Sequence, residues 1–189
     1  MTPDLVLIDR DGTLNAPATG DRYVVDPQEA HLLPGAGEAV RLLNVADVPV
    51  VVVTNQRGLA TGRLTAAQLT GVHDALIDQL ATCGAQVGGW YVCPHDVGVC
   101  DCRKPRPGLL LRALADRPGL APERCVIIGN AETDMLAGAA AGMPGILLGA
   151  DPGTDTVAGA VFPSLLDAVT GLLRAKSRTR EPRSGTTDS

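Results

Sequence analysis

The chain has 189 residues, a length that suits one sizeable hydrophobic core and, at the usual domain size, one domain. Hydrophobic residues make up 45% and aromatic residues only 2%, so the core must be built from Val, Leu, Ile and Ala, which favours buried parallel strands covered by helices. The net charge of -5 argues against nucleic acid as a partner, and no apolar run reaches the roughly 18 residues of a membrane span. Since the N-terminus also lacks a signal-type segment, we expect a cytoplasmic protein.

Predicted strands and helices alternate along the chain. The strands are short apolar runs, several of them rich in β-branched residues, and the helices carry apolar residues at three- and four-residue spacing. The predicted strands are 5–8, 50–53, 90–92, 125–129 and 145–149, and the predicted helices are 36 to near 47, 66–80, 109–115, 135–141 and 165–173. This alternation predicts the α/β class, with a doubly wound parallel sheet and helices on both faces. We expect one domain over 1–175 and a disordered polar tail over 176–189.

Polar residues follow three of the predicted strands at the point where each strand ends. Asp9 comes directly after the first strand, Thr54 after the second, and Asn130 closely follows the apolar part of the fourth. The carboxyl ends of parallel strands meet at one edge of the sheet, and ligands bind there in folds of this class. The sequence therefore predicts one crevice lined by these polar residues, with the long connection 16–33 running over the same edge.

Two carboxylates, Asp9 and Asp11, stand two residues apart at the end of the first strand. Both carboxylates cannot be buried in the core. Their mutual repulsion favours a bound divalent cation or a raised pKa of one of the two carboxyl groups. This pair suits phosphate chemistry, with Asp9 as the nucleophile, because it is the more rigidly held, and Asp11 as the general acid/base. The alternative interpretation is an Asx-rich turn.

Five residues are candidates for binding phosphate or the rest of a substrate. Thr54 and Asn55 can donate hydrogen bonds to phosphate oxygens, and Gln56 belongs to the same turn. Lys104 would supply a compact positive charge, although a solvated lysine is an equal alternative. Arg103 carries a planar fork of donors and is better suited to a second anionic or hydroxyl group of the substrate.

Four potential metal ligands, Cys93, His95, Cys100 and Cys102, lie within ten residues in the pattern C-x-H-x4-C-x-C. Cysteines in the cytoplasm are reduced, so this spacing indicates metal binding before disulfides. Three sulfurs and one imidazole fill a tetrahedral Zn²⁺ shell and leave no open position, so the predicted ion is structural. Chance or redox-active cysteines are the alternative. We expect a zinc-binding loop that holds the adjacent Arg-Lys pair beside the crevice.

Four stretches, DRDGTLN, TNQRG, CRKPRPG and GNAETDM, resemble in this order the motifs of the haloacid dehalogenase (HAD) superfamily of aspartyl phosphatases. With the zinc-binding loop, the chain resembles the histidinol-phosphatase-like branch, which includes D-glycero-D-manno-heptose 1,7-bisphosphate 7-phosphatases and histidinol-phosphate phosphatases. The resemblance covers residues 4–150 and implies a Rossmann-like HAD core without a large cap domain. It further implies hydrolysis of a phosphomonoester, with an aspartyl-phosphate at Asp9, Asp11 as the acid/base, and Thr54 and Lys104 as phosphate binders.

The same resemblance implies Mg²⁺ held by the Asp9 carboxylate, the Asp11 carbonyl and an acid at the end of the fourth strand. At that point the chain departs from the family, because Asn130 stands where an aspartate is usual. Asn130 can offer a neutral oxygen to the cation, but the affinity of the site for a hard cation should be lower than with an aspartate. Asp134, one helical turn further on, is a second candidate ligand or a helix cap.

Three functions remain open at this point, and a small phosphorylated metabolite is the expected partner in each. The sequence marks no interface, so the oligomeric state stays open, with a monomer as the default. The leading expectation is removal of the 7-phosphate of a heptose 1,7-bisphosphate, because Arg103 favours a second phosphate. The alternative is histidinol phosphate, since the carboxylates of the crevice would suit an amine. The third is a catalytically weakened protein that binds a phosphorylated metabolite, for which Asn130 is the support.

Overall fold

A parallel six-stranded sheet forms the centre of the computed structural model, which describes residues 2–20, 22–149 and 155–178. The strand order is β3-β2-β1-β4-β5-β6. In chain order the strands are β1 (Leu5–Ile8), β2 (Val50–Asn55), β3 (Trp90–Cys93), β4 (Cys125–Gly129), β5 (Gly145–Leu148) and β6 (Ala160–Phe162). β1 is central, and its Leu7 pairs with Val51 of β2 on one side and Ile127 of β4 on the other.

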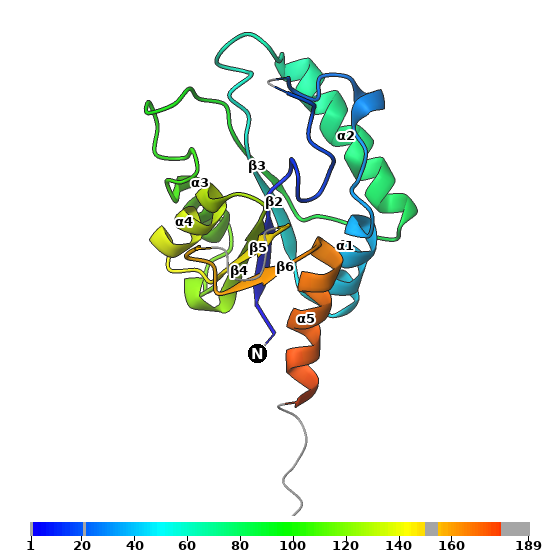
Figure 1. Cartoon of the computed structure of the whole chain (residues 1–189), viewed down its shortest axis with the longest axis vertical. Helices are drawn as coiled ribbons and strands as arrows, with labels where there is room; N and C mark the ends of the chain where they lie inside the picture. Colours follow the sequence, from blue (N-terminus) through cyan, green and yellow to red (C-terminus); the bar gives the residue numbers. More distant parts are fainter. Residues whose placement is uncertain (1, 21, 150–154, 179–189) are drawn as a thin grey trace, which may run out of the picture.

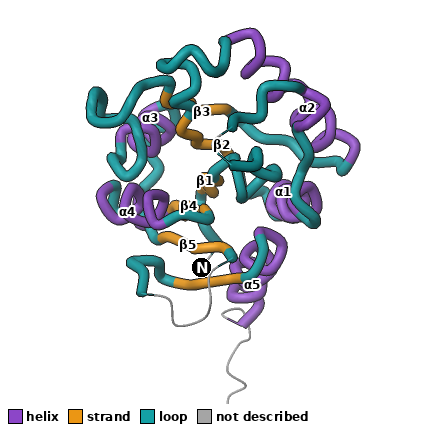
Figure 2. The backbone as a smooth tube through the Cα atoms, turned by 45° about the horizontal axis from the view of Figure 1, so that its top comes forward, coloured by secondary structure: helices purple, strands orange, loops and turns teal. Residues whose placement is uncertain are grey.

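Helices cover both faces of the sheet, as Figures 1 and 2 show. The helices are α1 (Ala36–Val45), α2 (Ala66–Thr82), α3 (Gly108–Ala115), α4 (Glu132–Ala140) and α5 (Leu165–Arg178), with 3-10 turns η1 (Pro27–Glu29) and η2 (Pro122–Arg124). α3 and α4 lie on one side, and α1, α2 and α5 lie on the other (Figure 2). This arrangement confirms the predicted α/β fold with helices on both faces, and no large cap domain interrupts the described part of the chain.

The apolar strands divide their side chains between two cores, because successive residues of a strand point to opposite faces. On β1, Val6 and Ile8 pack with α1 and α5, whereas Leu5 and Leu7 pack with α3 and α4, and all four are fully buried. A strand buried on both faces must be apolar at every position. The polar residues that follow β1 are therefore the first that can face a ligand.

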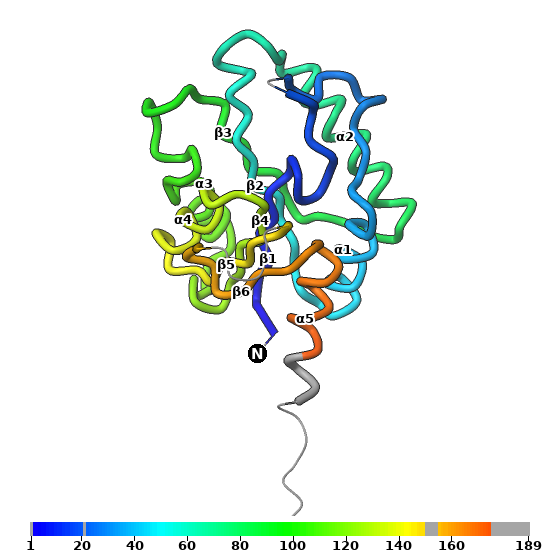
Figure 3. The backbone as a smooth tube through the Cα atoms, viewed as in Figure 1, coloured from blue at the N-terminus to red at the C-terminus, as the bar shows by residue number. Residues whose placement is uncertain are grey.

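The connections that leave β1, β2 and β3 gather at one end of the sheet, opposite the N-terminus (Figure 3). The long connection 16–33 is closed at its base, where the Ala16 amide donates to His31 and the Leu33 amide donates to Leu14, both at 2.9 Å. Helix α2 packs on this connection through Val72 and Leu76. These loops surround the carboxyl edge on which a crevice was predicted.

The largest differences from the sequence-based expectation are two helix boundaries and one strand. α4 begins at Glu132, three residues before the predicted start, because its polar first turn is capped by the Asp134 side chain, which accepts from the Ala131 amide. The edge strand β6 was not predicted, since three half-buried residues carry little pattern. α5 continues to Arg178 and so includes the start of the predicted tail, whose remaining residues, 179–189, lie outside the described ones. Within the described residues, no helix has the length and apolarity needed to span a bilayer.

Candidate active site

A buried ion pair between Asp9 and Lys104 lies at the carboxyl end of β1. The Asp9 amide still donates to Ile128 of β4 at 2.9 Å, so its backbone is held as part of the sheet. Lys104 Nζ lies 2.5 Å from Asp9 Oδ1 and 2.6 Å from Asp134 Oδ1, and it donates to the Val53 carbonyl at 2.9 Å. Lys104 is only 3% exposed, which excludes the alternative of a solvated lysine.

Burial and charge shift the pKa values of both partners. Burial raises the pKa of Asp9 to about 6, against the effect of Lys104 and together with the repulsion from Asp134 and Asp11. For Lys104, burial alone would lower the pKa, but the attraction of Asp9 and Asp134 outweighs it and the pKa rises. One buried ammonium therefore faces two buried carboxylates, and a cation or a proton would relieve the excess negative charge.

The Asp11 carboxylate is held from two sides and remains 32% exposed. Arg10, which is 1% exposed, donates from Nη2 to both Asp11 oxygens at 2.8 Å and from Nε to Oδ1 at 3.1 Å. Gln56 Nε2 donates to Oδ2 at 2.8 Å, and Asn15 Nδ2 donates to Oδ1 at 3.3 Å. Asp11 is thus a fixed carboxylate that solvent or a substrate can reach.

The last residues of β2 and the first residue after it hold their neighbours through side-chain hydrogen bonds. Asn55 Nδ2 donates to the Lys104 carbonyl at 3.0 Å, and the Lys104 amide donates to Asn55 Oδ1 at 3.1 Å. Gln56 Nε2 donates to the hydroxyl of Thr54 at 2.9 Å as well as to Asp11. The side-chain amides of Asn55 and Gln56 therefore orient other residues of the site. A direct contact of Thr54, Asn55 or Gln56 with phosphate stays a prediction.

Asn130, at the end of β4, faces the turn that follows β1. Thr13 Oγ1 donates to its Oδ1 at 3.3 Å. Gly12 has a φ of +83°, which favours glycine, and a Cβ atom there would lie 2.3 Å from Asn130 Nδ2. Asn130 is exposed and, with Gly12 and Thr13, lines one wall of a cavity of about 570 Å³. By contrast, Asp134 is 2% exposed, with one oxygen on the Ala131 amide and the other beside Lys104.

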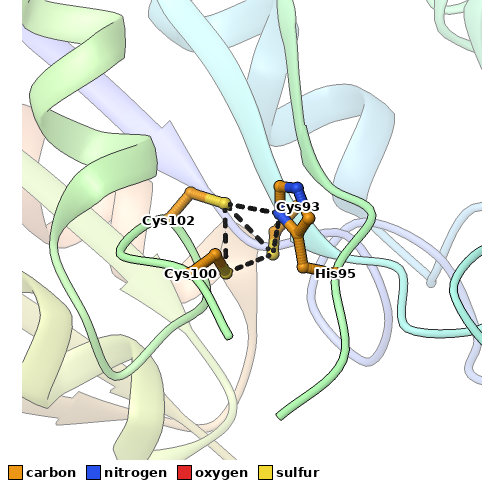
Figure 4. Close-up of side chains that lie close together, drawn as sticks. All are labelled: Cys93, His95, Cys100 and Cys102. Carbon is orange, nitrogen blue, oxygen red and sulfur yellow. Dashed lines mark hydrogen bonds between the residues drawn. The ribbon is translucent and has the colours of Figure 1, made fainter. Parts of the chain in front are cut away.

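The four predicted zinc ligands converge at one point (Figure 4), with their ligand atoms all within 4.8 Å of one another. The sulfur–sulfur distances are 3.3 Å for Cys93–Cys102, 3.4 Å for Cys100–Cys102 and 3.6 Å for Cys93–Cys100. His95 Nδ1 lies 3.2 Å from the Cys102 sulfur. A tetrahedron with zinc–sulfur bonds of about 2.3 Å has edges of about 3.8 Å, so this arrangement fits Zn²⁺.

The loop that carries the predicted zinc ligands, residues 93–104, is tied to the elements around it. Arg57, in the turn after β2, forms an ion pair with Asp96 at 2.5 Å, and Arg106 donates to the Cys100 carbonyl at 2.7 Å. The first residue of α3 must be Gly108, because a Cβ atom there would lie 2.4 Å from the Asp101 carbonyl oxygen. Arg103 is half-buried on this loop, and its Nη1 has no hydrogen-bond partner among the described residues.

Sequence reasoning missed two residues that hold Asp11 and a third that contacts one of these two. Arg10 and Asn15 lie inside the first motif, DRDGTLN. The available signal for Arg10 was its position between two acids, Asp9 and Asp11. The third residue, His73 of α2, contacts Arg10 Nη1 although it lies 63 residues away in the chain. No spacing rule connects positions so far apart, so only the packing of α2 against the sheet shows this contact.

Comparison with known proteins identifies relatives of the whole domain. Residues 101–167 match the family model described as HAD-hydrolase-like. Over 131 residues the chain is 38% identical to the D-glycero-alpha-D-manno-heptose-1,7-bisphosphate 7-phosphatase of Mycobacterium tuberculosis, a match that covers 69% of this chain and 68% of the relative. Over 161 residues it is 37% identical to the D-glycero-beta-D-manno-heptose-1,7-bisphosphate 7-phosphatase of Bordetella bronchiseptica, covering 84% and 88%.

A solved structure shares the whole architecture. The crystal structure of the D,D-heptose 1,7-bisphosphate phosphatase of B. bronchiseptica, in complex with magnesium and phosphate, superimposes with a TM-score of 0.81 at 34% identity. The match covers 91% of this chain and 99% of the other. The two chains therefore share one overall fold.

Proposed function

The chain belongs to the HAD family of phosphatases, and we propose that it removes the 7-phosphate of D-glycero-D-manno-heptose 1,7-bisphosphate through an aspartyl-phosphate intermediate. The observation that carries the mechanism is the buried contact of Asp9 with Lys104 at the carboxyl end of the sheet. This contact brings a carboxylate nucleophile and a cation for phosphoryl oxygens to one point. The names of the relatives support the choice of substrate.

In the first half of the reaction, a carboxylate oxygen of Asp9 attacks phosphorus and the bond from phosphorus to the sugar oxygen breaks. Lys104 balances negative charge on the phosphoryl oxygens, and Asp11 gives its proton to the departing oxygen. In the second half, Asp11 takes a proton from water while the water oxygen attacks phosphorus. This step releases phosphate and restores the Asp9 carboxylate.

Mg²⁺ fits the donors of this crevice, which are the Asp9 carboxylate, the Asp11 carbonyl and the Asn130 amide oxygen, because hard cations prefer oxygen ligands. The excess of buried carboxylate over ammonium beside Lys104 supports a cation here. When bound, Mg²⁺ would neutralise charge on the phosphate. Asp134 is a weaker candidate ligand, since both of its oxygens already lie beside protein partners.

Two features of the zinc-binding loop support a substrate with a second phosphate. Arg103 directly precedes the site lysine, and its Nη1 is buried without a partner among the described residues, a costly state that an anionic ligand would relieve. A guanidinium fork matches a phosphate in two hydrogen bonds. Zn²⁺ bound by the three cysteines and His95 would hold the loop that carries this arginine.

A second function, binding of a phosphorylated metabolite with little turnover, is favoured by one observation. Asn130 replaces a negative ligand by a neutral one at the predicted Mg²⁺ position. A weaker cation site would slow the reaction without closing the crevice.

One panel separates the candidates. The protein is incubated with excess Mg²⁺ and either anomer of the heptose 1,7-bisphosphate or histidinol phosphate, and released phosphate is measured, with Asp9→Asn as the inactive control. We expect release mainly from the heptose bisphosphate, with one anomer preferred. Release chiefly from histidinol phosphate would reject the heptose assignment. Binding of the heptose bisphosphate by calorimetry, with no phosphate released, would support the binding protein.

A further inference from the structure

Behind the partly exposed carboxylate of Asp11 lies a row of three side chains, in which Arg10 is buried and His73 and Trp90 are half-buried. The Arg10 guanidinium turns Nε and Nη2 toward Asp11, while Nη1 lies 3.3 Å from Nε2 of His73. Arginine has donors only, so His73 Nε2 must be the acceptor and the ring proton must sit on Nδ1. A guanidinium that is 1% exposed needs a partner for each of its edges, because an unpaired buried donor is costly.

His73 is itself fixed by a neighbouring ring. Its imidazole stacks on the Trp90 indole with centroids 4.3 Å apart and planes 23° from parallel. His73 comes from α2 and Trp90 from the start of β3, so two separate elements set the ring's position. Burial, reinforced by the charge of Arg10, lowers the pKa of His73 to about 4, and the ring is neutral near pH 7, as an acceptor must be.

We propose that His73 is a positioning residue for catalysis: it fixes the plane of the Arg10 guanidinium, which in turn directs the Asp11 carboxylate toward the leaving oxygen of the substrate. The proposal rests on the proposed role of Asp11 as the general acid/base. An arginine held only through its fork with Asp11 could move together with that carboxylate. A second anchor on Nη1 removes this freedom, and small displacements of a reacting group are costly in rate.

The competing explanation is that His73 only packs between α2 and the sheet. Two substitutions distinguish hydrogen bonding from packing. His73→Phe keeps a ring that can stack on Trp90 but has no acceptor for Arg10, whereas His73→Gln loses the stack and keeps an acceptor. Gln79→Ala is the matched control, because Gln79 lies on the same helix and its side chain bonds only backbone groups away from Arg10. It donates to the Ala30 carbonyl at 2.5 Å and to the Ala75 carbonyl of its own helix at 3.2 Å, and it accepts from the Leu32 amide at 3.1 Å.

The experiment compares kcat/KM for two substrates that differ in their need for a general acid, at saturating Mg²⁺. The heptose bisphosphate has an alkoxide leaving group that must be protonated, whereas 4-nitrophenyl phosphate has a leaving group that departs with little help. We expect His73→Phe to lower kcat/KM about tenfold for the sugar phosphate and less than about threefold for the aryl phosphate. The tenfold loss is a fraction of the usual contribution of general acid catalysis. His73→Gln should restore the ratio of the two activities, and Gln79→Ala should leave that ratio unchanged.

Equal losses on both substrates in His73→Phe would overturn the proposal and leave a packing role. If His73→Phe does not fold, as judged by circular dichroism, His73→Leu replaces it as the variant without an acceptor and is held to the same criterion. A native protein that hydrolyses neither substrate would instead reject the proposed function, and the positioning role would fall with it.

Discussion

Lys104 Nζ lies 2.5 Å from Asp9 Oδ1, although the two residues are 95 positions apart in the chain. Both are buried, and Asp134 Oδ1 lies 2.6 Å from the same ammonium. Such a pair is expensive to desolvate, and removal of one partner leaves the other charged and alone. The stability of the fold and the chemistry of the crevice therefore depend on the same three side chains.

Replacement of the lysine should damage the fold as well as the activity. We expect Lys104→Met to lower the free energy of unfolding by about 3–5 kcal/mol, because Asp9 and Asp134 would then repel each other without a cation. Urea denaturation of the two proteins measures the difference. Asp134→Asn in the Lys104→Met background should recover part of the loss, and failure to recover any of it would contradict this electrostatic account.

The raised pKa of Asp9 makes its contribution to stability depend on pH. The unfolded carboxyl titrates near 3.8 and the folded one near 6, so the folded state keeps its proton longer and loses relative stability as the pH rises through this window. In Mg²⁺-free buffer, the free energy of unfolding of the native protein minus that of Asp9→Asn should fall by up to about 3 kcal/mol between pH 4 and pH 7. A flat difference across that range would refute the burial effect assigned to Asp9.

A negative charge at position 130 should tighten Mg²⁺ binding. We expect Asn130→Asp to reduce the Mg²⁺ concentration for half-maximal phosphate release by about tenfold, because a charged oxygen replaces a neutral one in the shell of a hard cation. Calorimetry of Mg²⁺ binding gives the same comparison without turnover. Thr133→Asp is the control, since it adds the same charge at an exposed position nearby. An unchanged Mg²⁺ dependence in Asn130→Asp would remove position 130 from the metal site.

Zinc content should depend on the cysteines of the loop and on no other cysteine. We expect Cys100→Ser to lose bound zinc, measured by atomic absorption, and to unfold at a lower temperature, because the loop would lose its metal cross-link. Cys83→Ser is the matched control, since Cys83 is an exposed free thiol outside the cluster. Equal zinc content in the native protein and Cys100→Ser would contradict the site.

Much of the architecture could be predicted, because apolar runs such as Val50 to Val53 can only be buried strands in a chain of this composition. The parallel sheet and the HAD family are confirmed. The start of α4 and the strand β6 could not be placed, since a side-chain cap at Asp134 and a half-buried edge strand leave little pattern in the sequence.

The sequence alone specifies which residues are available at the carboxyl edge, because a motif at a strand's end gives both the residue types and their positions along the chain. It determined Asp9, Asp11 and the four zinc-ligand candidates as neighbours of the crevice or of its loop. The hydrogen-bond partners of these side chains become visible only in the folded protein. The amide of Asn55 binds the Lys104 backbone, and His73 of α2 reaches Arg10. Contacts over such separations arise from the packing of whole elements, which no local pattern encodes.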